Sequence, residues 1–107
     1  MIPAVINKIN IAKKNNENSV KIWGDGKSLR EFMFIEDLTN FILFSIKNID
    51  DLPNIINVGT GKDYRIEEYY IKIANEIGYN GKFEYDLSKP TGMHRKLVDT
   101  SILKSIG

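Results

Sequence analysis

The sequence VKIWGDGKSLREFMFIED at residues 20–37 contains the local signals that decide the fold. Residues 20–23 alternate apolar and polar side chains, which predicts a half-buried strand. The Gly24-Asp25-Gly26 segment predicts a tight turn, because glycine takes positive φ without a steric penalty. A second short strand is expected over residues 30–35. A helix is expected over residues 36–48, because it would begin with two carboxylates in its favourable first turn.

The same kinds of pattern extend from this stretch toward both ends of the chain. Apolar residues at three- and four-residue spacing predict two further helices, the second of which is expected to end at Gly78. Asp99 is expected to cap a last short helix. The predicted order is helix 2–12, strands 20–23 and 30–35, helix 36–48, strand 54–58, helix 66–77, strand 82–85, a polar loop 88–96 and the helix after Asp99. This order predicts a small mixed α/β fold.

The helix expected over residues 36–48 is apolar around nearly its whole circumference. Its middle contains Phe41, Ile42, Leu43, Phe44 and Ile46. A helix that is apolar on all sides has to be buried on all sides. A chain of 107 residues offers little material to cover it. We therefore expect the isolated chain to self-associate through this helix or to be only marginally stable.

The composition excludes several classes of protein. The chain has no cysteine and a single histidine, His94, so disulfides, thiolate metal sites and multi-histidine sites are excluded. The net charge of +1 predicts no attraction to nucleic acid or an anionic membrane. The longest strongly apolar run, residues 41–46, is far shorter than the about 20 residues of a membrane span. No signal peptide is evident, so we expect a cytoplasmic protein. The chain starts in a helix and stops just after one, so residues 1–107 are expected to form a single, partial domain.

Two short motifs fit enzyme sites only superficially. The Gly59-Thr60-Gly61 segment follows an expected strand, as a dinucleotide loop would, but Tyr64 occupies the position of the third glycine. Tyr85 and Lys89 have the Tyr-x-x-x-Lys spacing of a dehydrogenase pair. That chemistry needs both side chains on one helix face, whereas Tyr85 falls in an expected strand and Lys89 precedes a proline. We interpret the first motif as a structural turn and the second as coincidence.

Four segments together form a more specific pattern. They are MIPAVI at residues 1–6, the stretch 20–37, INVGTG at 56–61 and KPTGMHRKLVD at 89–99. In order and spacing they resemble the C-terminal part of the GDP-L-fucose synthase family, within the extended short-chain dehydrogenases/reductases. The Trp-Gly-x-Gly, Arg-Glu-Phe and Asn-Val-Gly-Thr-Gly elements are shared widely among nucleotide-sugar epimerases and dehydratases. The segment 89–99 narrows the resemblance to the GDP-sugar branch.

The resemblance implies an NADP(H)-dependent enzyme that epimerises GDP-4-keto-6-deoxy-mannose and then reduces its ketone. In such enzymes an N-terminal Rossmann domain binds the cofactor and holds the catalytic residues, and none of its motifs occurs in this chain. The resemblance therefore implies the substrate-binding portion of an extended short-chain dehydrogenase/reductase, with the Rossmann domain absent. We expect this chain alone to bind no NADP(H), to contain no catalytic residue and to be inactive. Its expected partners are a GDP-sugar and the missing Rossmann domain.

Four residues are candidates for binding the GDP-sugar. Trp23, the only tryptophan, is expected at a strand end, where a flat ring suits stacking on a purine or ribose. Arg30 can hold a diphosphate through two hydrogen bonds. Lys96 ends a polar loop able to close over phosphate. Lys8 occupies a position where many relatives carry arginine, so it would offer a point charge without the two-pronged geometry.

Two alternatives remain open. The chain could be the same region of another nucleotide-sugar epimerase, dehydratase or reductase. It could also be a non-catalytic binding or structural module.

Overall fold

The computed structural model describes residues 1–107, and its internal contacts divide them into two compact units. The first unit comprises Met1–Arg30 and Tyr64–Arg95, and the second comprises Glu31–Asp63 and Lys96–Gly107. Each unit is described by itself below. The expectation of one domain over the whole chain stays a prediction.

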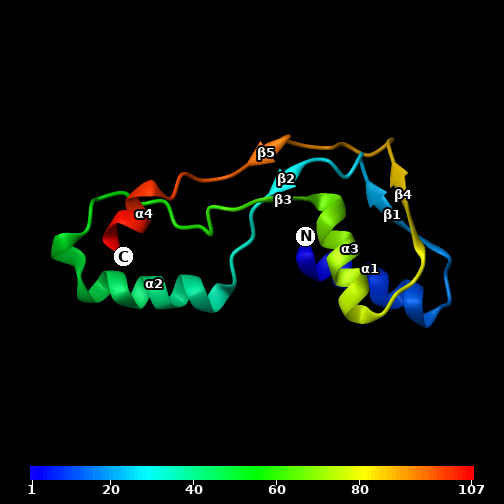
Figure 1. Ribbon diagram of the computed structural model, residues 1–107, viewed down its shortest axis with the longest axis horizontal. Helices are drawn as coiled ribbons and strands as arrows, with labels where there is room; N and C mark the ends of the chain where they lie inside the picture. Colours follow the sequence, from blue (N-terminus) through cyan, green and yellow to red (C-terminus); the bar gives the residue numbers. More distant parts are fainter. The chain divides into compact units, whose positions relative to one another are not determined.

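The first unit packs two helices against one face of a two-stranded sheet. The helices are α1 (Ile2–Lys14) and α3 (Ile66–Ile77), which contact each other (Figure 1). Strand β1 (Ser19–Trp23) runs parallel to β4 (Lys82–Asp86), with Ser19 opposite Lys82 and Trp23 opposite Asp86. The alternation predicted for β1 is confirmed, because Val20 and Ile22 are buried while Lys21 and Trp23 are exposed. The buried core is Val5, Ile9, Ala12, Val20, Ile22, Tyr70, Ala74 and Tyr79.

The start and end of α3 follow directly from its sequence. The Glu68 carboxylate accepts a hydrogen bond from the backbone N–H of Arg65 at 2.6 Å, which satisfies a donor at the helix start. Gly78 ends the helix with φ of 80°, a left-handed conformation that favours glycine. The predicted bounds of this helix and its glycine cap are confirmed.

A second small sheet has the strand order β3-β2-β5. Strand β2 (Leu29–Arg30) pairs antiparallel with β3 (Tyr64–Arg65), and β5 (Arg95–Lys96) begins with the last residue of the first unit. The strand expected over residues 30–35 is therefore wrong beyond Arg30. The physical reason is the length of β3, which offers ladder partners to only two residues. The expected polar loop 88–96 ends in β5.

The second unit contains α2 (Ile35–Lys47), a short 3-10 helix (Ile49–Asp51) and α4 (Ser101–Ile106). The predicted helix 36–48 is confirmed to within one residue at each end. The last helix begins one residue later than predicted, with Thr100 instead of Asp99 at its N-cap position, although Asp99 Oδ1 accepts a hydrogen bond from the Ser101 N–H at 2.8 Å. The strand expected over residues 54–58 is wrong, since the structure has no strand there. An extended segment becomes a strand only when a neighbouring segment completes a regular hydrogen-bond ladder with it.

The apolar helix α2 has no buried residue. Ile42, Leu43 and Ile46 are 49%, 53% and 65% exposed. Phe41 and Phe44 face a groove that Leu103 and Ile106 of α4 also line. The chain therefore does not cover this helix by itself, as its sequence pattern indicated. None of the helices is both long and apolar enough to cross a lipid bilayer.

Candidate functional site

A cavity of about 360 Å³ lies in the first unit, where β1 ends. Trp23 of β1, Lys8 of α1, Ile66 and Tyr70 of α3, and Thr91 are among the residues that line it. Parallel strands direct their carboxyl ends to one edge of a sheet, and ligands of α/β proteins bind at that edge. The position of this cavity makes it the candidate site.

Lys8 is held in place by the polar groups around it. Its Nζ donates a hydrogen bond to the Lys21 carbonyl oxygen at 3.0 Å and lies 3.5 Å from the Tyr70 hydroxyl. Desolvation by burial lowers the pKa of Lys8 from its ordinary value. A cation that has lost part of its water gains from an anion bound beside it.

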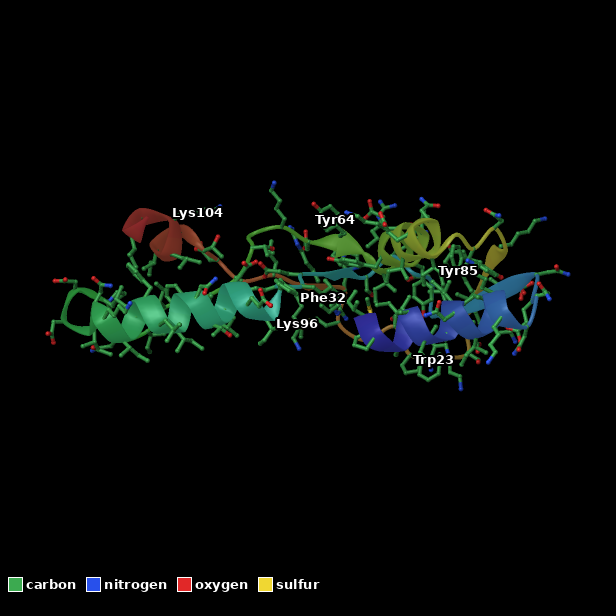
Figure 2. All side chains as sticks on the ribbon, turned by 90° about the horizontal axis from the view of Figure 1, so that it is seen from below. Trp23, Phe32, Tyr64, Tyr85, Lys96 and Lys104 are labelled. Atoms are coloured by element: carbon green, nitrogen blue, oxygen red, sulfur yellow. The ribbon has the colours of Figure 1, made fainter.

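Trp23 is an exposed aromatic ring with two ammonium groups close to it. It is 60% exposed, and Figure 2 shows it beside α1. The Nζ atoms of Lys8 and Lys89 lie 5.4 and 5.2 Å from its ring centroid. Both distances are within the range of cation–π attraction. The structure therefore brings two of the predicted residues, Lys8 and Trp23, together at the cavity.

Lys89 belongs to the same group, although the sequence reasoning missed it. A turn after β4 directs it toward Trp23: the Asp86 carboxylate accepts a hydrogen bond from the Ser88 N–H, and the Asp86 carbonyl accepts one from the Lys89 N–H. One signal in the sequence could have found it. Trp23 ends the expected strand 20–23 and Lys89 follows the expected strand 82–85, so pairing of these two strands would bring the two residues together. The sequence itself drew attention to Lys89 only through its spacing from Tyr85 and as the first residue of the segment 89–99.

The Tyr85–Lys89 spacing is a coincidence, as predicted. Tyr85 lies on β4, and its hydroxyl donates a hydrogen bond to Glu67 Oε2 at 2.7 Å. That hydrogen bond, together with desolvation and the charge of Glu67, raises the pKa of Tyr85. A phenol that serves as an acid or base beside a lysine needs the opposite shift.

Arg30 ends β2 in a half-buried position. Its Nη1 donates a hydrogen bond to the Leu29 carbonyl at 2.7 Å, and its own carbonyl accepts one from the Tyr69 hydroxyl at 2.8 Å. Arg30 does not line the cavity, but its Nη2 is near Gly92, which follows the cavity residue Thr91. Lys96 is exposed in the second unit (Figure 2), and its part in binding stays a prediction.

The Gly59-Thr60-Gly61 loop of the second unit already binds an anion, the Glu31 carboxylate. Glu31 Oε1 accepts hydrogen bonds from the Gly61 N–H at 2.7 Å and the Thr60 hydroxyl at 3.1 Å. A Cβ on Gly59 would lie 2.6 Å from the same oxygen, so a larger residue there would displace the Glu31 carboxylate. A phosphate would meet a negative charge where it needs free donors. The loop therefore does not fit NADP(H), and its interpretation as a structural turn is supported.

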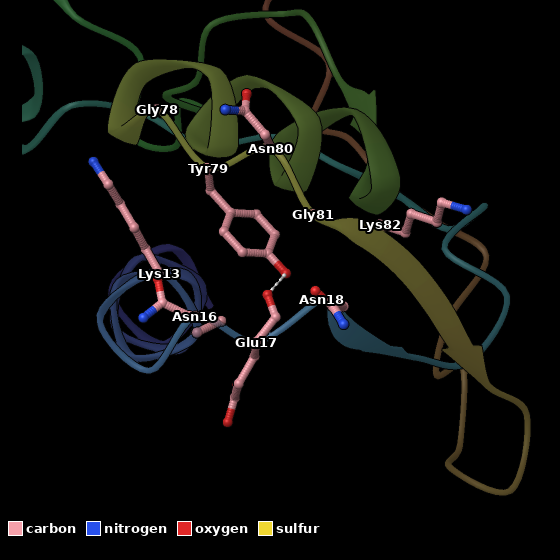
Figure 3. Close-up of a pocket in the computed structure, with 10 residues that line it drawn as sticks. Lys13, Asn16, Glu17, Asn18, Gly78, Tyr79, Asn80, Gly81 and Lys82 are labelled. Atoms are coloured by element: carbon pink, nitrogen blue, oxygen red, sulfur yellow. Dashed lines mark hydrogen bonds between the residues drawn. The ribbon is translucent and has the colours of Figure 1, made fainter.

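A larger cavity of about 680 Å³ lies at the opposite ends of the strands, beside Asn18 and Lys82 (Figure 3). Two of its polar side chains donate hydrogen bonds to the backbone of neighbouring segments. The Tyr79 hydroxyl donates a hydrogen bond to the Glu17 carbonyl at 3.0 Å, and Lys13 Nζ donates one to the Ile77 carbonyl at 2.7 Å. The second bond satisfies a carbonyl in the last turn of α3. We assign this cavity a structural role.

Comparison with known proteins identifies the family. Residues 1–59 match the family model described as the NAD dependent epimerase/dehydratase family. Over all 107 residues the chain is 53% identical to GDP-L-colitose synthase of Yersinia pseudotuberculosis and 43% identical to GDP-L-fucose synthase of Azorhizobium caulinodans. It covers 35% and 34% of these two proteins, so it spans about a third of their length.

Solved structures give the same result for the fold. GDP-mannoheptose C4 reductase of Campylobacter jejuni, solved with NADP bound, has a TM-score of 0.86 and 34% identity. A GDP-6-OMe-4-keto-L-xylo-heptose reductase of C. jejuni has a TM-score of 0.85 and 27% identity. Each match covers 99% of this chain, and 38% and 41% of the respective structure. The predicted mixed α/β fold of an extended short-chain dehydrogenase/reductase is thus confirmed, and the chain belongs to the NAD-dependent epimerase/dehydratase family.

Proposed function

We propose that this chain binds the GDP-sugar substrate of an NADP(H)-dependent epimerase and reductase of the GDP-L-fucose synthase type. The observation that carries the proposal is the pair of ammonium groups, on Lys8 and Lys89, within 5.5 Å of the exposed Trp23 ring. They lie beside a cavity at the carboxyl end of β1. The complete enzyme would convert GDP-4-keto-6-deoxy-mannose to GDP-L-fucose.

The chemistry of these residues suits a nucleoside diphosphate. Ammonium groups of Lys8 and Lys89 offset phosphate charge, and the indole offers a flat face to a base or ribose. Arg30 adds a guanidinium near the Thr91–Gly92 backbone. Lys96, in the second unit, is proposed as a phosphate-binding cation because of the family resemblance. As a lysine, Lys8 gives charge without imposing a planar two-pronged contact.

We assign no catalytic residue to this chain. Epimerisation next to a ketone needs a positioned acid and base, and the reduction needs a hydride from NADPH. The cavity beside Trp23 is lined by Lys8, by apolar side chains and by the hydroxyls of Tyr70 and Thr91, and burial raises the pKa of Tyr70. It has no carboxylate or imidazole that could act as the base. The proposed contribution of the chain is binding and orientation of the substrate.

The test uses Trp23 as an intrinsic fluorescent probe, since it is the only tryptophan. The full chain is titrated with GDP, GDP-mannose and UDP, and backbone amide shifts are followed in parallel. We expect saturable quenching by GDP and GDP-mannose, with shifts around Lys8, Trp23 and Thr91. Lys89→Ala should weaken binding, whereas Lys14→Ala, at an exposed lysine in the last turn of α1, serves as the matched control. Absence of saturable quenching and of amide shifts would refute the proposal.

A second candidate is a reductase for a different GDP-sugar. It is favoured by the higher identity to GDP-L-colitose synthase, 53% against 43% for the GDP-L-fucose synthase of Azorhizobium caulinodans. The two candidates share the diphosphate-binding role and differ only in the sugar. Titration with GDP-L-fucose and GDP-L-colitose, the sugars in the names of the two relatives, would separate them. A non-catalytic module is the remaining alternative, and equal affinity for GDP and UDP with no response to the sugar would favour it.

A further inference from the structure

Glu31 connects two segments of the second unit that are distant in sequence. Its Oε1 accepts from Gly61 and Thr60, and its Oε2 accepts from the Val98 N–H at 3.4 Å. Val98 is 67 residues away along the chain and two residues after Lys96. Glu31 itself directly follows Arg30. Glu31 is thus adjacent in sequence to Arg30, and its hydrogen bond to Val98 lies two residues from Lys96. Both Arg30 and Lys96 are proposed to bind phosphate.

The backbone of Gly59 comes close to both this carboxylate and the Val98 side chain. A Cβ on Gly59 would lie 2.6 Å from Glu31 Oε1 and 2.7 Å from Val98 Cγ2. The loop, the carboxylate and the Val98 side chain therefore converge on one glycine. This close approach is independent of the hydrogen bonds and indicates that the three parts are held together.

The hydrogen bonds favour the ionised form of Glu31. Desolvation acts to raise its pKa, but the bonds from Gly61, Val98 and Thr60 outweigh that effect and lower the pKa below its ordinary value. At neutral pH the loop therefore faces a full negative charge. Only a carboxylate accepts on both oxygens at once, because the amide of glutamine has one acceptor oxygen.

We propose that Glu31 is a positioning residue, whose carboxylate ties the Gly59–Gly61 loop to Val98 and so holds in one conformation the segment that bears Lys96, a proposed phosphate-binding residue. The part concerning diphosphate rests on the proposed function. Glu31 does not touch the ligand in this scheme. It acts through the backbone that carries Lys96.

The first experiment needs no ligand. In the wild-type chain, the amide shifts of Gly61 and Val98 should titrate together, with a midpoint below the ordinary glutamate value of 4.5. Glu31→Gln should abolish this titration and increase backbone motion at Lys96–Val98 in nitrogen-15 relaxation. Glu84→Gln, at an exposed glutamate of β4 in the other unit, is the matched control and should change neither. Amide shifts that ignore pH in this range would overturn the proposal, and this wild-type readout stands even if Glu31→Gln fails to fold.

The second experiment measures GDP binding through Trp23 fluorescence. Glu31→Gln should weaken GDP binding about 5- to 10-fold, at the low end of ordinary coupling between sites. Glu31→Asp keeps the charge and should recover part of the loss. Released Gly61 and Val98 amides with unchanged GDP affinity would overturn the positioning role. Failure of the wild-type chain to bind GDP would refute the proposed function and the diphosphate part of this proposal, while the pH titration decides separately whether Glu31 holds the loop.

Discussion

At the scale of single residues, the candidate site is organised by fixed cations around an exposed ring. Lys8 is held by the Lys21 carbonyl, and Arg30 bonds to its own strand through the Leu29 carbonyl. Ordering these long side chains in advance reduces the entropy that a ligand has to remove on binding. Charge and order together make these positions sensitive to substitution.

Arg30→Ala tests the largest expected contact with the diphosphate. Losing a charge-assisted pair of hydrogen bonds should cost about 2–3 kcal/mol, or roughly 30- to 150-fold in GDP affinity. Lys96→Ala should act in the same direction but more mildly, because a lysine offers a single point contact. Titration calorimetry with GDP measures both. Unchanged affinity in Arg30→Ala would remove Arg30 from the site.

Glu31 makes the stability of the chain depend on pH. Because its pKa is lowered on folding, the carboxylate contributes stability above its ordinary value of 4.5, and this contribution is lost as the pH falls through the folded value. The urea midpoint of the wild-type chain should therefore fall on acidification by more than that of Glu31→Gln. Asp86 and Asp99, whose pKa values are also lowered, act equally in both proteins. Parallel pH profiles of the two proteins would contradict this assignment.

At the scale of elements, the helices were predicted more accurately than the strands. The helices α2 and α3 match their predicted ranges closely, because helical hydrogen bonds are made within the segment. The predicted strand bounds were wrong where the structure offers only a short partner strand or forms no strand. Residues 31–34 and 54–58 have strand-like sequences, but neither segment forms a strand in the structure. A strand forms only when two segments hydrogen-bond to each other, whereas a sequence pattern describes one segment at a time.

The uncovered helix α2 predicts self-association. Each large apolar side chain left in water forgoes about 1.5–3 kcal/mol, and Ile42, Leu43 and Ile46 are all half exposed or nearly so. A second copy is the proposed occupant, because an identical apolar stripe is complementary to itself about a two-fold axis. Sedimentation velocity across a concentration series should show a dimer.

The control for the predicted self-association is a charged residue placed among the exposed apolar side chains of α2. Ile46→Glu, at a side chain that is 65% exposed, should shift the chain to monomer while leaving its helical circular dichroism unchanged. A wild-type chain that stays monomeric at every concentration and melts at high temperature would contradict the prediction.

At the scale of the whole molecule, the chain spans about one third of the length of its relatives and provides the proposed substrate cations. We expect the isolated chain to have no epimerase or oxidoreductase activity. We also expect it not to bind NADPH, because its only loop with a dinucleotide-like pattern already holds Glu31. Fluorescence titration with NADPH checks this expectation, and a micromolar dissociation constant would contradict it.

The sequence by itself determined the helices, the glycine turns, the α/β class and the family resemblance, since these depend on local spacing and on motifs. It also singled out Lys8 and Trp23, which the structure brings together. Only the tertiary structure decided that Lys89 joins them and that Glu31, instead of a phosphate, is bound by the Gly59–Gly61 loop. The physical reason is distance along the chain: Lys89 is 66 positions from Trp23, and Gly61 is 30 from Glu31. Contacts over such separations depend on how the chain folds back on itself, which no local pattern encodes.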